Sequence, residues 1–113
     1  MSSVLELDDF VRVGNVGTEF NVTMTEVVNN VEVVIDFAVD AIDTSSIEIR
    51  KPRGQTQLLA SSIKNPPGND GIITATDSSG IFDVRGRWAC RGVLNFTGGN
   101  VFKGSWAGFT VGE

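Results

Sequence analysis

The sequence predicts an all-β domain, an immunoglobulin-like antiparallel β-sandwich. Short runs rich in Val, Ile, Phe and Trp recur along the 113 residues, and turn-forming residues separate these runs at close intervals. No stretch repeats apolar residues at helical spacing. Several short strands with frequent turns and no helix are typical of a sandwich, and a small β-barrel is the alternative architecture.

A single domain is expected over residues 10–113, preceded by a flexible N-terminal arm over residues 1–9. A chain of this length buries enough surface to form one core without disulfides. In the arm, Leu5 and Leu7 alternate with acidic residues. This alternation suits an edge strand that adds to the sheet of a neighbouring subunit, and a frayed terminus is the alternative.

The clearest strand pattern in the first half of the domain runs from Thr18 to Val28. Phe20, Val22 and Met24 alternate there with polar residues, so we expect these three side chains to face the core. The pair Asn29-Asn30 tolerates the left-handed backbone conformation and therefore predicts a hairpin turn. The strands predicted for the whole domain are 10–16, 18–28, 31–37, 47–51, 56–63, 72–75, 86–96 and 101–111.

The middle of the chain predicts a loop followed by a hairpin. Residues 36–46 carry three aspartates among apolar residues, and we expect a loop there with a short helical turn around Val39 to Asp43. Ile47 and Ile49 then alternate with charged residues and are expected to face inward. Pro52 to Gln55 contains a proline and a glycine, which predict the turn of this hairpin.

The hairpin from Gly86 to Val111 is expected to supply much of the core. Trp88 and Cys90 fall on one face of its first strand, and Arg87 and Arg91 fall on the other, as in a half-buried strand. The second strand has poorer sidedness, and its glycines indicate a bulge or close packing. The residues that we predict for the core are Phe20, Val22, Ile47, Ile49, Trp88 and Phe109.

The charge balance limits the kinds of partner. The chain has 14 acidic and nine basic residues and a net charge of −5, so nucleic acids and anionic membranes, which need a basic surface, are not expected partners. No apolar run approaches the ~20 residues that span a bilayer. The N-terminus lacks the basic and apolar regions of a signal peptide. We therefore expect a protein that is made in a cytosol and stays soluble unless it leaves inside a larger particle.

Catalytic, metal and cofactor sites are not predicted. The chain has no histidine, which removes the usual general base, and its single cysteine, Cys90, is expected to be buried. The acids and amides that resemble calcium ligands do not follow the spacing of an EF-hand loop and occur in ordinary turn sequences, so we expect them to stabilise turns. These residues are Asp36, Asp40, Asp43, Asn69, Asp70 and Asp77.

The surface suggests two kinds of binding. Trp106 stands beside Ser105 and Ala107 and is expected to be partly exposed, which suits a sugar-stacking platform or a protein interface. The basic residues on the strands and turns form either a solvated face or a docking surface for an acidic neighbouring subunit. They are Arg50, Lys51, Arg53, Arg85, Arg87 and Arg91.

The order of several short motifs resembles small immunoglobulin-like virion proteins of tailed bacteriophages, and is similar to the N-terminal domains of phage upper baseplate proteins. The motifs are Gly14-Asn15-Val16-Gly17-Thr18-Glu19-Phe20, Ile47-Glu48-Ile49-Arg50-Lys51-Pro52-Arg53-Gly54, Asp70-Gly71, Gly86-Arg87-Trp88 and the closing Trp106 to Val111. Arg53 stands where this family usually has an acidic residue, and the loop from Asn65 to Gly71 is richer in proline.

The resemblance implies a non-enzymatic virion structural protein of the tail, baseplate or neck, or a capsid decoration protein. Its partners would be other virion subunits and further copies of the same chain, assembled in the host cytoplasm. For these contacts we predict Leu5, Leu7, Phe10, Arg50, Arg53 and Trp106. The alternative function is a carbohydrate-binding module in which Trp106 is the stacking platform.

Overall fold

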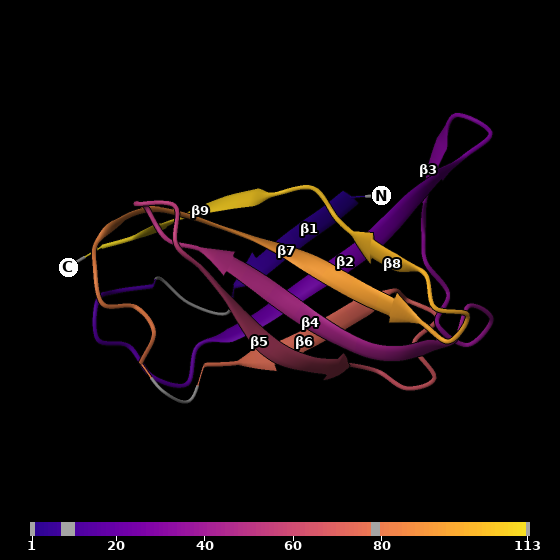
Figure 1. The fold of residues 1–113 in the computed structure, drawn as a ribbon, viewed down its shortest axis with the longest axis horizontal. Helices are drawn as coiled ribbons and strands as arrows, with labels where there is room; N and C mark the ends of the chain where they lie inside the picture. The colour runs from indigo at the N-terminus through magenta and orange to yellow at the C-terminus, as the bar shows by residue number, and fades with distance from the viewer. Residues whose placement is uncertain (1, 8–10, 78–79, 113) are drawn as a thin grey trace.

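A computed structural model of the chain describes residues 2–7, 11–77 and 80–112 and confirms the all-β prediction. The described residues form strands, turns and loops, with no helix among them (Figure 1). The strands are β1 (Ser2–Leu7), β2 (Glu19–Val28), β3 (Val31–Val34), β4 (Ile42–Arg50), β5 (Thr56–Ile63), β6 (Ile72–Thr76), β7 (Gly86–Phe96), β8 (Val101–Lys103) and β9 (Ala107–Val111).

The strands form an antiparallel sandwich whose two halves are joined through β5. The path is β1-β2-β6-β5-β4-β7-β8, with β9 also paired to β7 and β3 to β2. Strand β5 pairs along most of its length with β4, and with β6 only at Ser62 and Ile63. The orders β1-β2-β6-β5 and β4-β7-β9 correspond to the two sheets of the immunoglobulin fold. The continuous path through β5 gives this sandwich a barrel-like curl.

The core lies between the two halves and contains all six residues that the sequence places there. Each of them is at most 7% exposed. Four aromatic rings form its centre, with ring centroids 5.3–6.3 Å apart, and edge-to-face or tilted contacts of this kind stabilise a core beyond the area that they bury. These rings belong to Phe20, Phe82, Trp88 and Phe109.

Strand β1 differs from the expectation of a free arm. Ser2–Leu7 pairs antiparallel with β2 of the same chain, and Leu5 packs against the core. The alternation of Leu5 and Leu7 with acids does indicate a strand that adds to a sheet edge, but the edge is the chain's own. The last residues of the expected arm, 8–9, and Phe10 lie outside the described residues.

Several other sequence predictions are wrong in their bounds. The strand expected at 31–37 ends at Val34, and the strand expected at 47–51 is β4, which runs from Ile42 to Arg50. Residues 11–16 contain only an isolated bridge from Arg12 to Gly112, not a strand. The expected helical turn at 39–43 is a turn at residues 36–40, where the Asp36 carbonyl accepts the amides of Val39 and Asp40. The expected strand at 101–111 is two strands, β8 and β9, separated by residues 104–106.

The hairpin of β2 and β3 projects beyond the body of the sandwich (Figure 1). Its turn is Asn29-Asn30, as predicted, and both asparagines have positive φ angles, 52° and 63°. Strand β3 is exposed at every residue. Where the hairpin leaves the sheet, the Met24 amide donates to the Gly71 carbonyl and the Met24 carbonyl accepts the Ile35 amide. Strands β6 and β3 therefore pair with the same edge of β2, β6 with its first half and β3 with its last residues.

Candidate functional site

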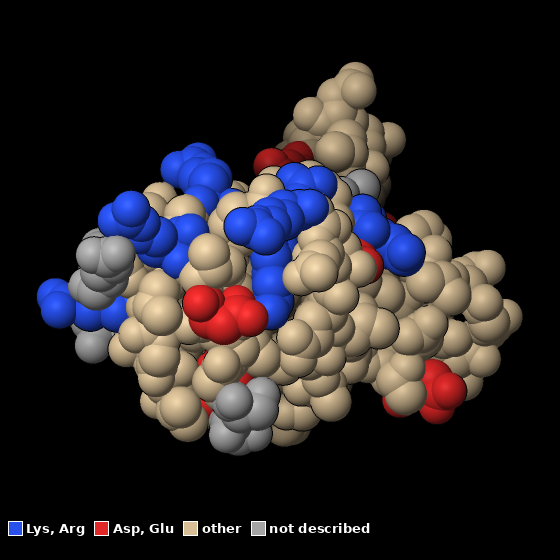
Figure 2. Space-filling view, turned by 60° about the vertical axis from the view of Figure 1, so that its left-hand side comes forward, with Lys and Arg blue, Asp and Glu red and all other residues tan. Residues whose placement is uncertain are grey.

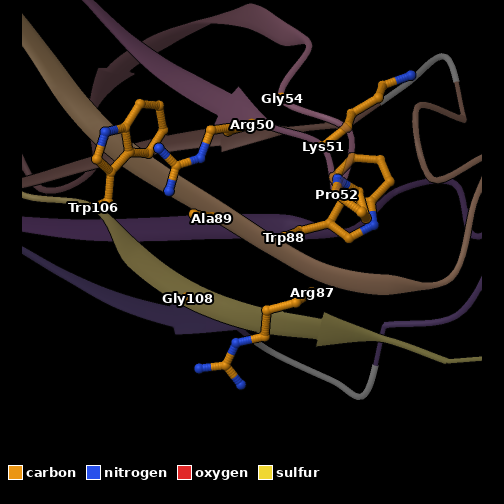
Figure 3. Close-up of a pocket in the computed structure, with 9 residues that line it drawn as sticks. All are labelled: Arg50, Lys51, Pro52, Gly54, Arg87, Trp88, Ala89, Trp106 and Gly108. Carbon is orange, nitrogen blue, oxygen red and sulfur yellow. The ribbon is translucent and has the colours of Figure 1, made fainter.

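The candidate site is an open pocket of about 330 Å³ on the outer surface, at the end of the sheet where β4, β7 and β9 lie side by side (Figure 3). Tryptophan and basic side chains dominate its lining. The residues that line it are Arg50, Lys51, Pro52, Gly54, Arg87, Trp88, Ala89, Trp106 and Gly108.

Strand register brings the basic residues onto one face. Arg50 on β4 pairs with Ala89 on β7, and Glu48 pairs with Arg91. Side chains on a strand alternate between its two faces, so Arg50, Arg87 and Arg91 all point outward while Ile49 and Trp88 point into the core. This is the physical reason that the alternation of basic and apolar residues produces a positively charged outer face.

Trp106 joins this face from the loop between β8 and β9. The guanidinium carbon of Arg50 lies 4.4 Å from the centroid of its ring, and that of Arg91 lies 4.3 Å from it. Cation–π contacts at this distance hold ring and guanidinium groups together, and Figure 3 shows Arg50 beside the half-buried indole. We call the outer surface formed by Arg50, Arg87, Arg91 and Trp106 the Trp106 face.

Trp88 belongs to the core rather than to the exposed part of this face, as predicted. It is 1% exposed, and its indole N–H donates to the Val84 carbonyl at 3.0 Å. The Lys51 ammonium lies 5.7 Å from the centre of the ring. Trp88 therefore supports the floor of the pocket, and Trp106 is the aromatic side chain that a partner would contact.

Two of the cations around the pocket are neutralised within the chain. Arg91 donates to Glu48 at 2.6 Å, and Lys51 donates to Asp83 at 3.0 Å. The hydrogen bond from Lys51 lowers the pKa of the Asp83 carboxyl below its ordinary value. In contrast, no described carboxylate lies within ion-pair distance of Arg50 or Arg87.

Arg87 owes its position to a glycine on the neighbouring strand. A Cβ atom added at Gly108 would lie 3.1 Å from Nη2 of Arg87 and 3.3 Å from Nε, so the guanidinium lies directly over the Gly108 backbone. Arg87 is exposed and extends over β9 (Figure 3). The absence of a side chain at 108 thus leaves room for this guanidinium over β9, with its Nε and Nη2 edge nearest to the strand.

The chemistry of this arrangement is anion recognition. A guanidinium offers a planar fork of donors that matches a carboxylate, and the exposed edge of an indole adds apolar contact. The thiol nearest the site, Cys90, is fully buried, and burial raises its pKa to about 12, so it remains protonated at neutral pH. Across the described ranges, no group of three or more Cys, Asp or Glu side chains is arranged to hold a metal ion.

The structure brings together two of the six residues that the sequence predicts for assembly, Arg50 and Trp106. Arg53 is exposed in the β4–β5 turn and lines a separate, smaller pocket with Asp83. Leu5 is half-buried against the core, and Leu7 pairs with Phe20 in the sheet. Phe10 lies outside the described residues.

Gly108 belongs to the site but is absent from the residues that the sequence predicts for it, and Arg87 is predicted only as one of the basic residues of a solvated face or docking surface, not among the six assembly contacts. The alternation of Arg87 with Trp88 indicates that Arg87 points outward, but no local pattern reveals that it lies over a glycine twenty-one residues later.

Two of the acidic turn residues, Asp70 and Asp77, stabilise turns as predicted, whereas Asp43 lies in β4. Asp77 is completely buried, and its carboxylate accepts the backbone amides of Gly80 and Ile81 at 3.1 and 3.2 Å. Asp70 accepts the side-chain amide of Asn65 at 2.8 Å and the Ile72 backbone amide at 3.3 Å. These carboxylates therefore replace missing backbone partners in turns.

Comparison with protein-family models, curated proteins and solved structures found no match to this chain. The described segments contain no helix with the length and hydropathy that crossing a membrane requires. The function is therefore inferred from the geometry of the Trp106 face and from the surface around it.

Proposed function

We propose that this protein is a non-enzymatic structural component of a tailed-phage virion that acts through protein–protein contacts. In this proposal the Trp106 face docks an acidic segment of a neighbouring subunit, and assembly takes place in the host cytoplasm. The resemblance of the motif order to small immunoglobulin-like virion proteins suggests the setting. The immunoglobulin-like order of the strands supports that resemblance at the level of the fold.

The observation that carries the docking role is a pair of cations that have no acidic partner among the described residues. Arg50 and Arg87 are exposed, lie on the same outer face and have no described carboxylate within ion-pair distance, although the whole chain carries an excess of acidic residues. Figure 2 shows a face of the molecule on which Lys and Arg side chains cover more of the surface than the acids that lie among them. A locally basic surface directs association toward a partner of opposite sign.

The environment of Trp106 favours a protein partner over a sugar. A sugar ring needs an open aromatic face, but the guanidinium carbons of Arg50 and Arg91 both lie within 4.4 Å of the ring centroid. An indole in contact with two arginines is typical of a protein interface, where aromatic residues and Arg are enriched. The carbohydrate-binding alternative therefore has less support from the site than docking has.

The test is rebinding of the full chain to purified phage particles that lack it, measured by cosedimentation at several salt concentrations. The wild-type chain should bind to saturation, and the double substitution Arg50→Gln and Arg87→Gln should weaken binding at least about tenfold, which corresponds to the loss of about 1.4 kcal/mol or more. The matched control is Lys103→Gln, which removes an exposed cation from β8. A chain that ignores particles, but is retained on a glycan through Trp106, would refute the proposal.

A further inference from the structure

The β2–β3 hairpin is the most apolar exposed feature among the described residues. Twelve large hydrophobic side chains are exposed in the part of the chain that the structure describes, and five of them are valines of this hairpin, with Val27 68% and Val31 59% exposed. An isolated two-stranded ribbon is marginally stable in water, and a concentrated apolar surface marks an interaction site. Figure 2 shows the hairpin standing clear of the body. The five valines are Val27, Val28, Val31, Val33 and Val34.

The register of the hairpin gives one of its faces both apolar and acidic character. Val28 pairs with Val31, and Glu26 pairs with Val33, so these four side chains share a face. No described cation lies within ion-pair distance of Glu26. The face therefore presents three valines and a carboxylate that has no counterion among the described residues of its own chain.

This face complements the Trp106 face. Three valines match the apolar edge of Trp106, and the Glu26 carboxylate matches the guanidinium groups of Arg50 and Arg87, which also lack described counterions. The charges of the two ends agree with this pairing. The loop from β3 to β4 adds Asp36 and Asp40 at the hairpin end, and the start of β4 adds Asp43. The β4–β5 turn carries Lys51 and Arg53 at the other end, and the segment that enters β7 carries Arg85 and Arg87 (Figure 1).

We infer that the β2–β3 hairpin of one copy docks on the Trp106 face of a second copy. The inference rests on the proposed function and names the partner of the same site. The end of β4 and the start of β7, which carry Arg50 and Arg87, lie toward the end of the 41 Å long body that is opposite the hairpin (Figure 1), so the hairpin of a copy does not reach these arginines of its own chain. The association is heterologous, and copies joined in this way form a ring if the rotation closes and a filament if it does not.

The expected affinity is modest and sensitive to salt. One hairpin covers less than the ~800 Å² per partner of a standard stable interface, and the charged contacts are screened as ionic strength rises. The oligomer should therefore form at high protein concentration and low salt, and dissociate on dilution or on addition of salt. In a particle, other subunits would raise the local concentration of the chain.

The experiment measures the molar mass of the full chain by sedimentation velocity and light scattering at low salt. The face variant carries Arg50→Gln and Arg87→Gln, and the hairpin variant carries Val28→Ser and Val31→Ser. All four positions are exposed, and retention of the fold is checked by circular dichroism and thermal unfolding. The matched control is Val101→Ser, which changes a valine of β8 that is 56% exposed and lies outside both surfaces.

The wild-type chain and the Val101→Ser control should form the same concentration-dependent oligomers, and each of the two double variants alone should be monomeric under the same conditions. A mixture of these two variants should form a 1:1 dimer that does not grow, because the intact hairpin of one meets the intact Trp106 face of the other. This capped dimer is specific to a heterologous contact. The interface should weaken at least about tenfold with either pair of substitutions.

Three outcomes would overturn the inference. They are a wild-type chain that stays monomeric at low salt, oligomers that survive both pairs of substitutions, and a mixture of the two variants that remains monomeric. The particle-binding test separates this failure from failure of the proposed function. If the chain is monomeric but still binds particles through Arg50 and Arg87, the docking between copies is refuted and the proposed virion role stands. If the chain forms oligomers but does not bind particles, the proposed virion role is refuted.

Discussion

Replacement of Gly71 by alanine tests the junction at which the projecting hairpin leaves the sandwich. Gly71 has a φ angle of 71°, in the left-handed region, and its carbonyl accepts the Met24 amide. A Cβ atom at this position would lie 2.9 Å from the carbonyl oxygens of both Ile35 and Met24. Both atoms belong to the backbone, so no side-chain rotation relieves the contact.

The expected loss of stability has two parts. The left-handed conformation costs a non-glycine residue about 1–2 kcal/mol, and forcing the backbone apart to accept a methyl group costs about 1–3 kcal/mol more. Gly71→Ala should therefore lower the free energy of unfolding by about 2–5 kcal/mol, less a few tenths to about 1 kcal/mol because alanine also restricts the unfolded chain. A central value of about 3 kcal/mol is a large share of the stability of a small domain.

The assay is urea unfolding followed by tryptophan fluorescence, which reports on Trp88 within the aromatic core. With a slope of about 1.5 kcal/mol per molar urea, a loss of about 3 kcal/mol lowers the midpoint by about 2 M. The matched control is Gly54→Ala, because Gly54 has a φ angle of 90° but a Cβ atom added there would meet no atom within 4 Å. The control should show only the conformational cost, about half of the effect or less.

Equal losses for the two variants would refute the argument from backbone contact at Gly71. A loss at Gly71 that is smaller than the loss at Gly54 would show in addition that the junction adjusts freely. Either result would remove the reason to regard the base of the hairpin as fixed, and the hairpin would then have no defined direction relative to the body.

Three further predictions concern buried and paired groups. Burial raises the pKa of the Cys90 thiol from 9.0 to about 12, so between these pH values the thiol is ionised in the unfolded chain and protonated in the folded chain. The free energy of unfolding should therefore fall by about 1.4 kcal/mol per pH unit between pH 9 and about 12. The Cys90→Ala variant should lack this part of the pH dependence. Asp77→Ala should cost about 2–4 kcal/mol in chemical unfolding, since two backbone amides lose their buried acceptor; an unchanged midpoint would contradict this. A double-mutant cycle with Arg91→Gln and Glu48→Gln should give a coupling of about 1 kcal/mol, and a coupling of zero would show that solvent screens the pair.

The parts of the fold that could be predicted are those with strict alternation. Thr18 to Val28 and Gly86 to Phe96 alternate because one face of each strand is buried, and both are strands in the structure. The first half of β4 was missed because its residues, from Asp43 to Ser46, are polar and lie largely outside the core. A strand that is little buried carries no hydrophobic pattern, so the sequence offers no signal for it.

The candidate site could be predicted only one residue at a time. Exposure of Trp106 and outward orientation of Arg87 follow from their neighbours in sequence, but the contact between Arg50 and Trp106 joins residues 56 positions apart. That contact depends on the register between β4 and β7 and on the break that separates β8 from β9. Both are results of long-range packing, which local periodicity does not contain.

The position of β9 has a consequence for how the chain matures during synthesis. Phe109 and Val111 complete the core, and the Gly112 backbone bonds to Val11 and Val13, so β9 and the residue after it secure segments that were translated much earlier. A nascent chain that still lacks β9 exposes the edge of β7 that pairs with β9, together with the aromatic rings around Trp88. The sandwich should therefore complete its fold only after β9 has left the ribosome, and a ribosome that pauses before residue 107 would hold a chain that is prone to aggregate or to recruit chaperones.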